Sequence, residues 1–105
     1  MEKRIYTLSD EEYATFAEKI KGRLTSPCYF TGTIEILGRE GESLCLTASL
    51  ILYRRRVDDF TQYGAHDAIY AVVPVWWDFY CEDDEGIVFD DFDFVRFRSF
   101  LIEEE

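Results

Sequence analysis

The chain has 105 residues, of which 48% are apolar and 17% aromatic, so we expect residues 1–105 to form a single domain with one packed core. Such a content of aromatic side chains excludes a disordered chain. The 22 acidic and 11 basic residues give a formal net charge of −11, and a field of that sign repels nucleic-acid phosphates and anionic lipids. We therefore expect no nucleic-acid partner and no membrane binding.

The cysteines and the histidine give no sign of a metal or a cofactor. Cys28, Cys45 and Cys81 form no C-x-x-C pair, and His66 is the only histidine. No basic flank followed by an apolar run lies near the start, and no apolar run approaches the roughly 20 residues of a membrane span. These observations predict a cytoplasmic protein with reduced thiols and no cofactor.

The clearest pattern is an amphipathic helix near the N-terminus. Residues 5–8 fit a short strand or an extended lead-in, and Ser9 then begins a capping box that Glu12 completes. The apolar stripe of this helix consists of Tyr13, Phe16, Ala17, Ile20 and Leu24. The helix should therefore end near Leu24, before Pro27.

A β-hairpin follows, and its register can be predicted. Apolar residues alternate over residues 30–36 and again over 44–52. A two-residue loop would put the two apolar faces on opposite sides of the sheet. A three-residue loop over 39–41 pairs Ile36 with Leu44, and it puts Gly41 where a left-handed residue is favoured. Pattern and turn chemistry therefore select the same register.

The second arm of this hairpin is long for a compact domain. A strand over residues 42–57 would span about 50 Å at ~3.3 Å per residue, whereas a domain of this size has a radius of gyration of about 13 Å. The strand should bend, or end near Tyr53. Residues 58–67 should form a surface loop.

A second apolar block covers residues 69–81. Both of its faces are apolar, which predicts a central strand, with Pro74 either at a bulge or dividing the block in two. The turn at 84–86 resembles the turn at 39–41. A loop of the same type would pair Cys81 with Phe89.

Residues 92–102 fit a helix capped by Asp90 or Asp91 better than a strand. The elements together predict an α+β fold. The N-terminal amphipathic helix packs on a three- to four-stranded antiparallel sheet, and a short C-terminal helix follows.

The negative charge is concentrated at the C-terminal end. Residues 82–105 hold ten acidic residues and two arginines, which gives −8 of the net −11. A calcium loop over 81–92 fails, because Cys81 and Phe92 would occupy its first and twelfth positions, where carboxylates supply ligands. We expect an acidic hairpin turn and no metal site. Such a surface attracts a basic protein partner, but acidity is also a common means of keeping a protein soluble, and this second interpretation is favoured.

Arg54, Arg55 and Arg56 form the one basic cluster in the sequence. They are a candidate anion site. Alternatively, they finish an edge strand whose charge prevents aberrant pairing.

The adjacent pair Trp76 and Trp77 marks a candidate interaction surface. Adjacent strand residues point to opposite faces, so at least one tryptophan should lie outside the helix-covered core. With Tyr70 and Tyr80 it would form an apolar platform of the kind that binds a partner. In the alternative, the helix over 92–102 covers that face and both tryptophans belong to the core.

The order of segments 30–36, 46–55 and 73–79 with the turn Asp83-Asp84-Glu85-Gly86 resembles small bacterial proteins of unknown function. This resemblance implies a cytoplasmic accessory protein and names no site. No nucleophile motif is present, so an enzyme is disfavoured. We expect a non-enzymatic protein-interaction or structural accessory protein, with a homodimer as one form. The alternative is a small-ligand or anion-binding domain, and an acidic nucleic-acid mimic ranks below it.

Overall fold

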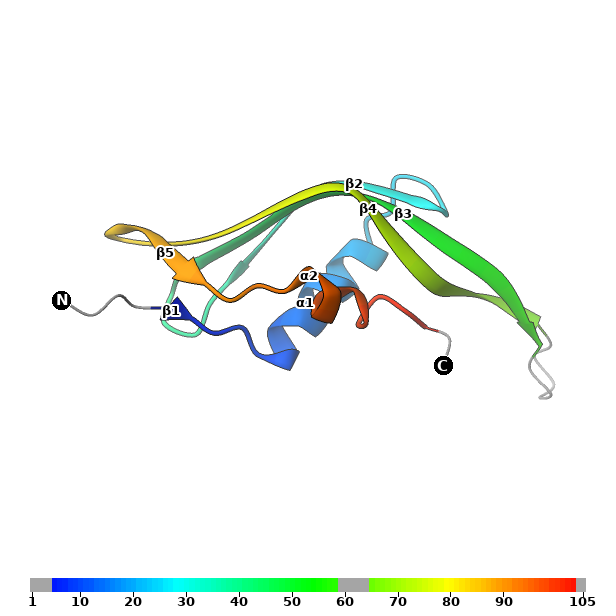
Figure 1. The fold of residues 1–105 in the computed structure, drawn as a ribbon, viewed down its shortest axis with the longest axis horizontal. Helices are drawn as coiled ribbons and strands as arrows, with labels where there is room; N and C mark the ends of the chain where they lie inside the picture. The colour runs from blue at the N-terminus through cyan, green and yellow to red at the C-terminus, as the bar shows by residue number, and fades with distance from the viewer. Residues whose placement is uncertain (1–4, 59–64, 104–105) are drawn as a thin grey trace.

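The computed structural model describes residues 5–58 and 65–103 (Figure 1). Along the chain the elements are β1 (Ile5–Tyr6), α1 (Asp10–Lys21), β2 (Tyr29–Leu37), β3 (Ser43–Asp58), β4 (Ala65–Asp83), β5 (Gly86–Asp90) and α2 (Phe94–Arg98). The strands form one sheet in the order β1-β5-β4-β3-β2. The α+β class is confirmed.

The sheet is larger than predicted, and it is mixed rather than purely antiparallel. The lead-in forms β1 and runs parallel to β5, with Ile5 beside Phe89 and Tyr6 beside Asp90. The other three strand pairs are antiparallel. A two-residue strand is too short to show a hydrophobic period, and its partner lies near the other end of the chain.

Helix α1 begins as predicted. The Ser9 Oγ accepts a hydrogen bond from the Glu12 amide at 3.2 Å, and Glu12 Oε1 accepts one from the Ser9 amide at 2.9 Å. The helix ends at Lys21 with Gly22 as its C-cap, about one turn before the predicted end at Leu24. Leu24 still packs against the core from the turn that follows.

The register of the β2–β3 hairpin is confirmed. Ile36 lies opposite Leu44, and the pairing continues without a shift to Tyr29 opposite Ile51. Gly41 closes the three-residue loop with φ of 88°, in the left-handed region. Its side-chain position faces open space, so only the backbone conformation requires glycine there.

Replacing Gly41 by alanine should therefore lower the free energy of unfolding by about 1 kcal/mol, the usual cost of a left-handed alanine. Urea denaturation measures this difference. Gly22→Ala is the matched control, because Gly22 has φ of −79° and should tolerate alanine. An equal effect of both substitutions would contradict the role assigned to Gly41.

Strand β3 bends without ending at Tyr53, and it continues to Asp58. The long hairpin of β3 and β4 arches over the helices, and the molecule measures 58 × 24 × 19 Å (Figure 1). The predicted loop over 58–67 is wrong at its ends, because Asp58 belongs to β3 and residues 65–67 belong to β4; its central part, 59–64, lies outside the described residues. Of the two predicted alternatives the strand therefore bends, and its far end extends beyond the core together with β4, which pairs with it along its length.

Pro74 lies at a bulge, one of the two predicted alternatives. Ser49 of β3 lies opposite Trp76, and Leu50 lies opposite Pro74. Val75 of β4 is therefore the extra residue of the bulge. The apolar block is therefore one bulged strand, not two. β4 has a neighbouring strand on both sides only at residues 81–83, where β5 pairs with it. Over the rest of its length it is paired with β3 alone.

The predicted pairing of Cys81 with Phe89 is wrong by one residue. Cys81 pairs with Val88 across a two-residue loop. This register buries both Cys81 and Val88, and it leaves Phe89 on the other face, where it lies beside Ile5 of β1. In this register β5 also pairs with β1, and the sequence of the β4–β5 hairpin alone does not encode that second pairing.

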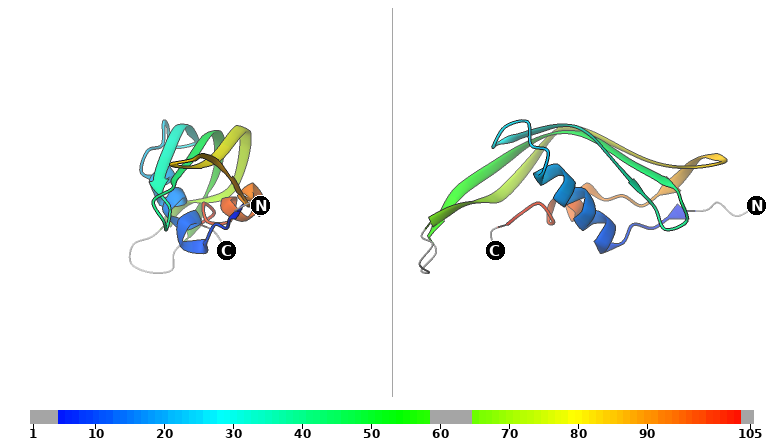
Figure 2. Two further views of the ribbon diagram at one scale, coloured as in Figure 1. Left: turned by 90° about the vertical axis from the view of Figure 1, so that its left-hand side faces the viewer. Right: turned by 180° about the vertical axis from the view of Figure 1, so that it is seen from behind.

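The C-terminal helix forms but is short. Its cap is Asp93 rather than Asp90 or Asp91, and the Asp93 carboxylate accepts a hydrogen bond from the Val95 amide at 3.0 Å. Both helices lie on the same, concave face of the arched sheet (Figures 1 and 2). Phe97 of α2 contacts Tyr13 and Phe16 of α1, with ring centroids 6.3 and 6.5 Å apart.

Candidate interaction surface

The convex face of the sheet bears the candidate surface. In β3 the buried residues Leu44, Leu46 and Leu50 face the helices, so the residues between them face the convex side. The cross-strand partners Ser49–Trp76 and Cys45–Tyr80 therefore project outward. No helix or strand of the described residues covers this face (Figure 1).

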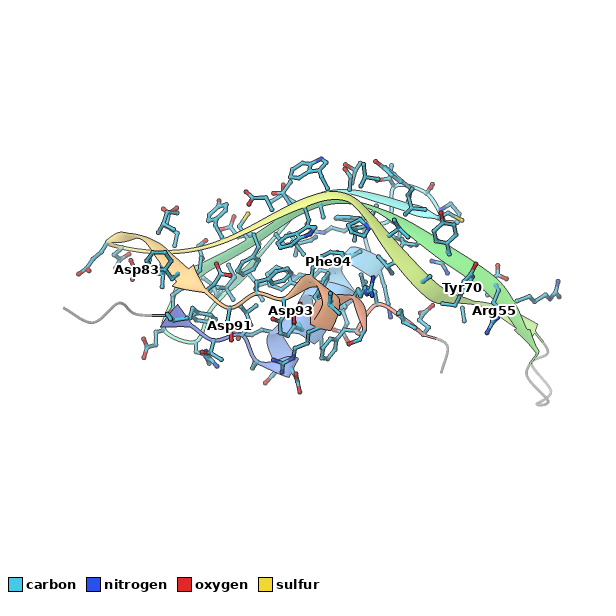
Figure 3. All side chains as sticks on the ribbon, in the orientation of Figure 1. Arg55, Tyr70, Asp83, Asp91, Asp93 and Phe94 are labelled. Carbon is cyan, nitrogen blue, oxygen red and sulfur yellow. The ribbon has the colours of Figure 1, made fainter. Side chains whose placement is uncertain are left out.

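Five exposed apolar side chains lie along the convex side of β3 and β4, and we call them the aromatic patch: Tyr53, Tyr70, Val73, Trp76 and Tyr80. Trp76 is the largest of them and is 51% exposed. The rings of Tyr53 and Tyr70 lie 6.3 Å apart, and the Arg55 guanidinium lies 5.3 Å from the Tyr70 ring centroid. Figure 3 shows Arg55 and Tyr70 close together on the β3–β4 hairpin, on the part of the arch that lies away from β5.

Trp77 belongs to the opposite face, although the sequence grouped it with Trp76. It lies opposite Ala48 and stacks on Phe94 of α2, with ring centroids 5.5 Å apart. It remains 39% exposed at the border of the helical layer. The alternative in which the second helix covers the face of Trp76 is wrong, because α2 packs beside α1.

Polar side chains beside the patch are held in place across β2 and β3. Thr31 and Ser49 share a hydrogen bond of 2.9 Å, and Thr33 and Thr47 share one of 3.0 Å. The Ser43 hydroxyl donates to Glu35 at 2.8 Å. These bonds order the convex face before any partner binds, which lowers the entropic cost of association.

Acidic groups border the same face. The pKa of Tyr80 is raised by a hydrogen bond with Cys45 and by the nearby charges of Glu82 and Glu35. Asp78 also projects outward, opposite Thr47. The aromatic patch is therefore negative around Tyr80, whereas Arg55 lies at its other end beside Tyr70.

The three arginines of the candidate anion site do not converge. Arg54 donates from Nε to the carbonyl oxygen of Pro27, whereas Arg55 stacks on Tyr70. Arg56 lies opposite Asp67 in β4. Successive strand residues alternate between faces, so Arg55 points away from Arg54 and Arg56. The anion site stays a prediction, with a weaker basis.

Much of the C-terminal acidity satisfies backbone amides. Asp83 accepts from the Glu85 amide at 2.8 Å, and Asp91 accepts from the Leu8 amide at 2.8 Å. Asp90 accepts from the Phe92 amide at 3.0 Å. These carboxylates order turns, as such residues commonly do. Among residues 5–58 and 65–103, no three His, Cys, Asp or Glu side chains lie together in a way that could hold a metal ion.

Burial raises the pKa of Asp90, and the charges of Asp91 and Asp78 raise it further. Because the pKa of Asp90 is raised in the folded state, its neutral carboxyl stabilises the fold relative to the charged one. This stabilisation is lost as the pH rises through the folded-state pKa. Asp90→Asn keeps the oxygen that accepts from Phe92 and removes the charge. The urea midpoint should therefore rise modestly at pH 7, and the gain should vanish near pH 3. A gain that is equally large at both values would contradict the assigned cause, and Asp84→Asn in the exposed turn is the charge-matched control.

A second polar cluster joins β1, α1 and the β2–β3 loop, and the sequence did not predict it. The Tyr6 hydroxyl donates to Glu12 and accepts from the Arg39 amide at 3.2 Å. Glu42 is almost fully buried, and one of its oxygens accepts from the Glu40 amide at 2.9 Å. A cavity of about 380 Å³ lies beside this cluster, lined by Ile5, Tyr6, Thr7, Arg39, Glu40 and Glu42. The capping box was the one sequence signal that pointed to Glu12.

No family model matches the chain, and comparisons with curated proteins and with solved structures give no significant match. In the described part of the chain, no helix is long and apolar enough to cross a membrane. The fold and the surface together define a class: a small acidic α+β protein with an uncovered aromatic sheet face.

Proposed function

We propose that this is a non-enzymatic protein-interaction protein whose contact surface is the aromatic patch. The observation that carries the proposal is the exposure of Trp76 on a sheet face that no described element covers. Tyrosine and tryptophan are enriched at the energetic centres of protein interfaces, and an exposed cluster of them usually marks a partner surface. The ordered threonines and serines beside the patch support the same role.

Shape and charge define the partner. The patch lies on a convex surface, which a concave partner surface can follow over its length, whereas a second convex face would touch it only along a ridge. Glu35, Asp78 and Glu82 border the patch, and the whole chain carries −11. We therefore expect a partner with an apolar, concave surface and with basic groups that face the Tyr80 end of the patch.

A small-ligand site at the polar cluster is the second proposal. The cavity of about 380 Å³ falls within the size range of ligand pockets. Its walls are largely polar, however, and Tyr6 and Arg39 already bond to protein groups. This arrangement favours a structural role over ligand binding, so we rank the site below the aromatic patch.

Site-specific photocrosslinking tests the proposed surface. Trp76 and Tyr80 are replaced one at a time by p-benzoylphenylalanine, and the variants are irradiated in an extract of the native cells at low and at high salt. Val95 is the control position, because it is 64% exposed but lies on α2. Both patch positions should give the same discrete adduct, weakened by salt, and Val95 should not. No adduct, or equal adducts from all three positions, would refute the proposal.

A further inference from the structure

The two long edges of the sheet are treated differently. The free edge of β4 contains Pro74 and a bulge, and the C-terminal segment covers it at Ile69, whose carbonyl accepts from the Glu103 amide at 2.8 Å. Bulges, prolines and covering segments are the devices that keep edge strands from pairing. The outer strand β2 has no proline, lysine, arginine or register shift over Tyr29–Leu37.

The backbone groups of β2 can be assigned to its two sides. Gly38 donates to the Glu42 carbonyl at 2.8 Å, so the even-numbered residues of β2 bond to β3 and the odd-numbered residues point outward. The outward amide of Tyr29 bonds to Ser26, and that of Thr31 bonds to the Thr25 hydroxyl. Within the described chain, the outward N–H groups of Thr33, Glu35 and Leu37 have no such partner.

We propose that this edge pairs antiparallel with the same edge of a second copy, about a two-fold axis at Ile34. Thr33 then lies opposite Glu35 of the second copy, and Leu37 opposite its Thr31. Each open N–H of Thr33, Glu35 and Leu37 finds one carbonyl on Glu35, Thr33 or Thr31 of the other copy, respectively. The Thr31 amide exchanges its exposed 3.3 Å bond to the Thr25 hydroxyl for the Leu37 carbonyl of the other copy. The open stretch is therefore its own complement.

The side chains fit this register. Leu37 is 78% exposed, and the pairing covers it with the threonine of the other copy. Glu35 faces Thr33 rather than its own counterpart, and the Ser43 hydroxyl holds it toward β3 at 2.8 Å. The pairing uses no residue of the aromatic patch, so it leaves that surface available to another partner.

Sedimentation velocity over a wide concentration range tests the pairing. The wild type should form a dimer, and Thr33→Pro should raise the dissociation constant of that dimer at least tenfold. Proline removes the outward N–H of residue 33 but leaves the hydrogen bonds between β2 and β3 in place. Leu37→Lys should do the same by placing a charge on the edge. Val75→Lys, at the bulge of the protected edge, is the matched control and should keep the dimer.

Amide hydrogen exchange distinguishes this edge from another contact. The amides of Thr33, Glu35 and Leu37 should exchange at least tenfold more slowly at high than at low protein concentration, even if Thr33→Pro fails to fold. A wild type that remains monomeric at millimolar concentration overturns the inference. So does a dimer that Leu37→Lys leaves intact, or concentration-dependent protection confined to other strands.

Discussion

Replacing Phe97 by alanine is expected to lower the free energy of unfolding by about 3–5 kcal/mol, the usual cost of removing a buried phenylalanine. Phe97 of α2 is fully buried, and its ring contacts Tyr13 and Phe16 of α1. Its ring centroid is 5.7 Å from that of Phe92 and 5.8 Å from that of Phe94. A cavity there would be surrounded by aromatic rings that cannot all move inward together.

Urea denaturation of Phe97→Ala measures this loss. A loss of this size is a large part of the total stability of a small domain, about 5–15 kcal/mol. Val95→Ala on the same helix is the control and should change stability by less than about 0.5 kcal/mol, because Val95 faces solvent. A loss below about 1 kcal/mol for Phe97→Ala would contradict the packing of α2 on the concave face.

Gly38→Ala should be the second most damaging of the substitutions considered, with a loss of about 2–3 kcal/mol. A β-carbon at Gly38 would lie 2.7 Å from Glu42 Oε1 and 2.9 Å from the Tyr6 hydroxyl oxygen. Both atoms are buried and hydrogen-bonded, so moving either one breaks a bond to the Glu40 or the Arg39 amide. The cost is therefore overpacking together with lost hydrogen bonds.

The comparison of Gly38→Ala with Gly41→Ala separates two reasons for glycine in one loop. Gly38 lacks space, whereas Gly41 has space but a left-handed backbone. Thermal or urea unfolding should show the larger loss at Gly38. If Gly38→Ala were the milder of the two, the polar cluster of Tyr6 and Glu42 would not be as tightly packed as described.

Local signals predicted the parts of the fold that neighbouring residues determine. The capping box of Ser9 and Glu12 sets the start of α1, because both partners lie within one turn. The register of β2 and β3 follows from a short loop and from apolar alternation on one buried face. Each of these features is encoded within a short stretch of sequence.

Features that depend on distant residues could not be predicted in this way. β1 is two residues long and pairs with β5 near the other end of the chain. The register of the β4–β5 hairpin differs from that of β2–β3, although both turns carry an acidic residue followed by glycine. Sequence analysis could not locate the polar cluster either, because Tyr6, Arg39 and Glu42 meet only in the folded chain.

For the candidate surface, the sequence predicted that one tryptophan of the adjacent pair leaves the core, but not which one. Both faces of residues 69–81 are apolar, so periodicity cannot assign the helix-covered face. The position of α2 decides it, because Phe94 stacks on Trp77 and leaves Trp76 uncovered.

The most direct test of the proposed function uses the protein partner that is crosslinked from position 76. Its affinity for the wild type and for Trp76→Ala is measured by calorimetry. A residue at the centre of an interface should make the dissociation constant at least about tenfold weaker when it is truncated. Val95→Ala should bind as the wild type does. Equal affinities of the wild type and Trp76→Ala would contradict the aromatic patch as the contact surface.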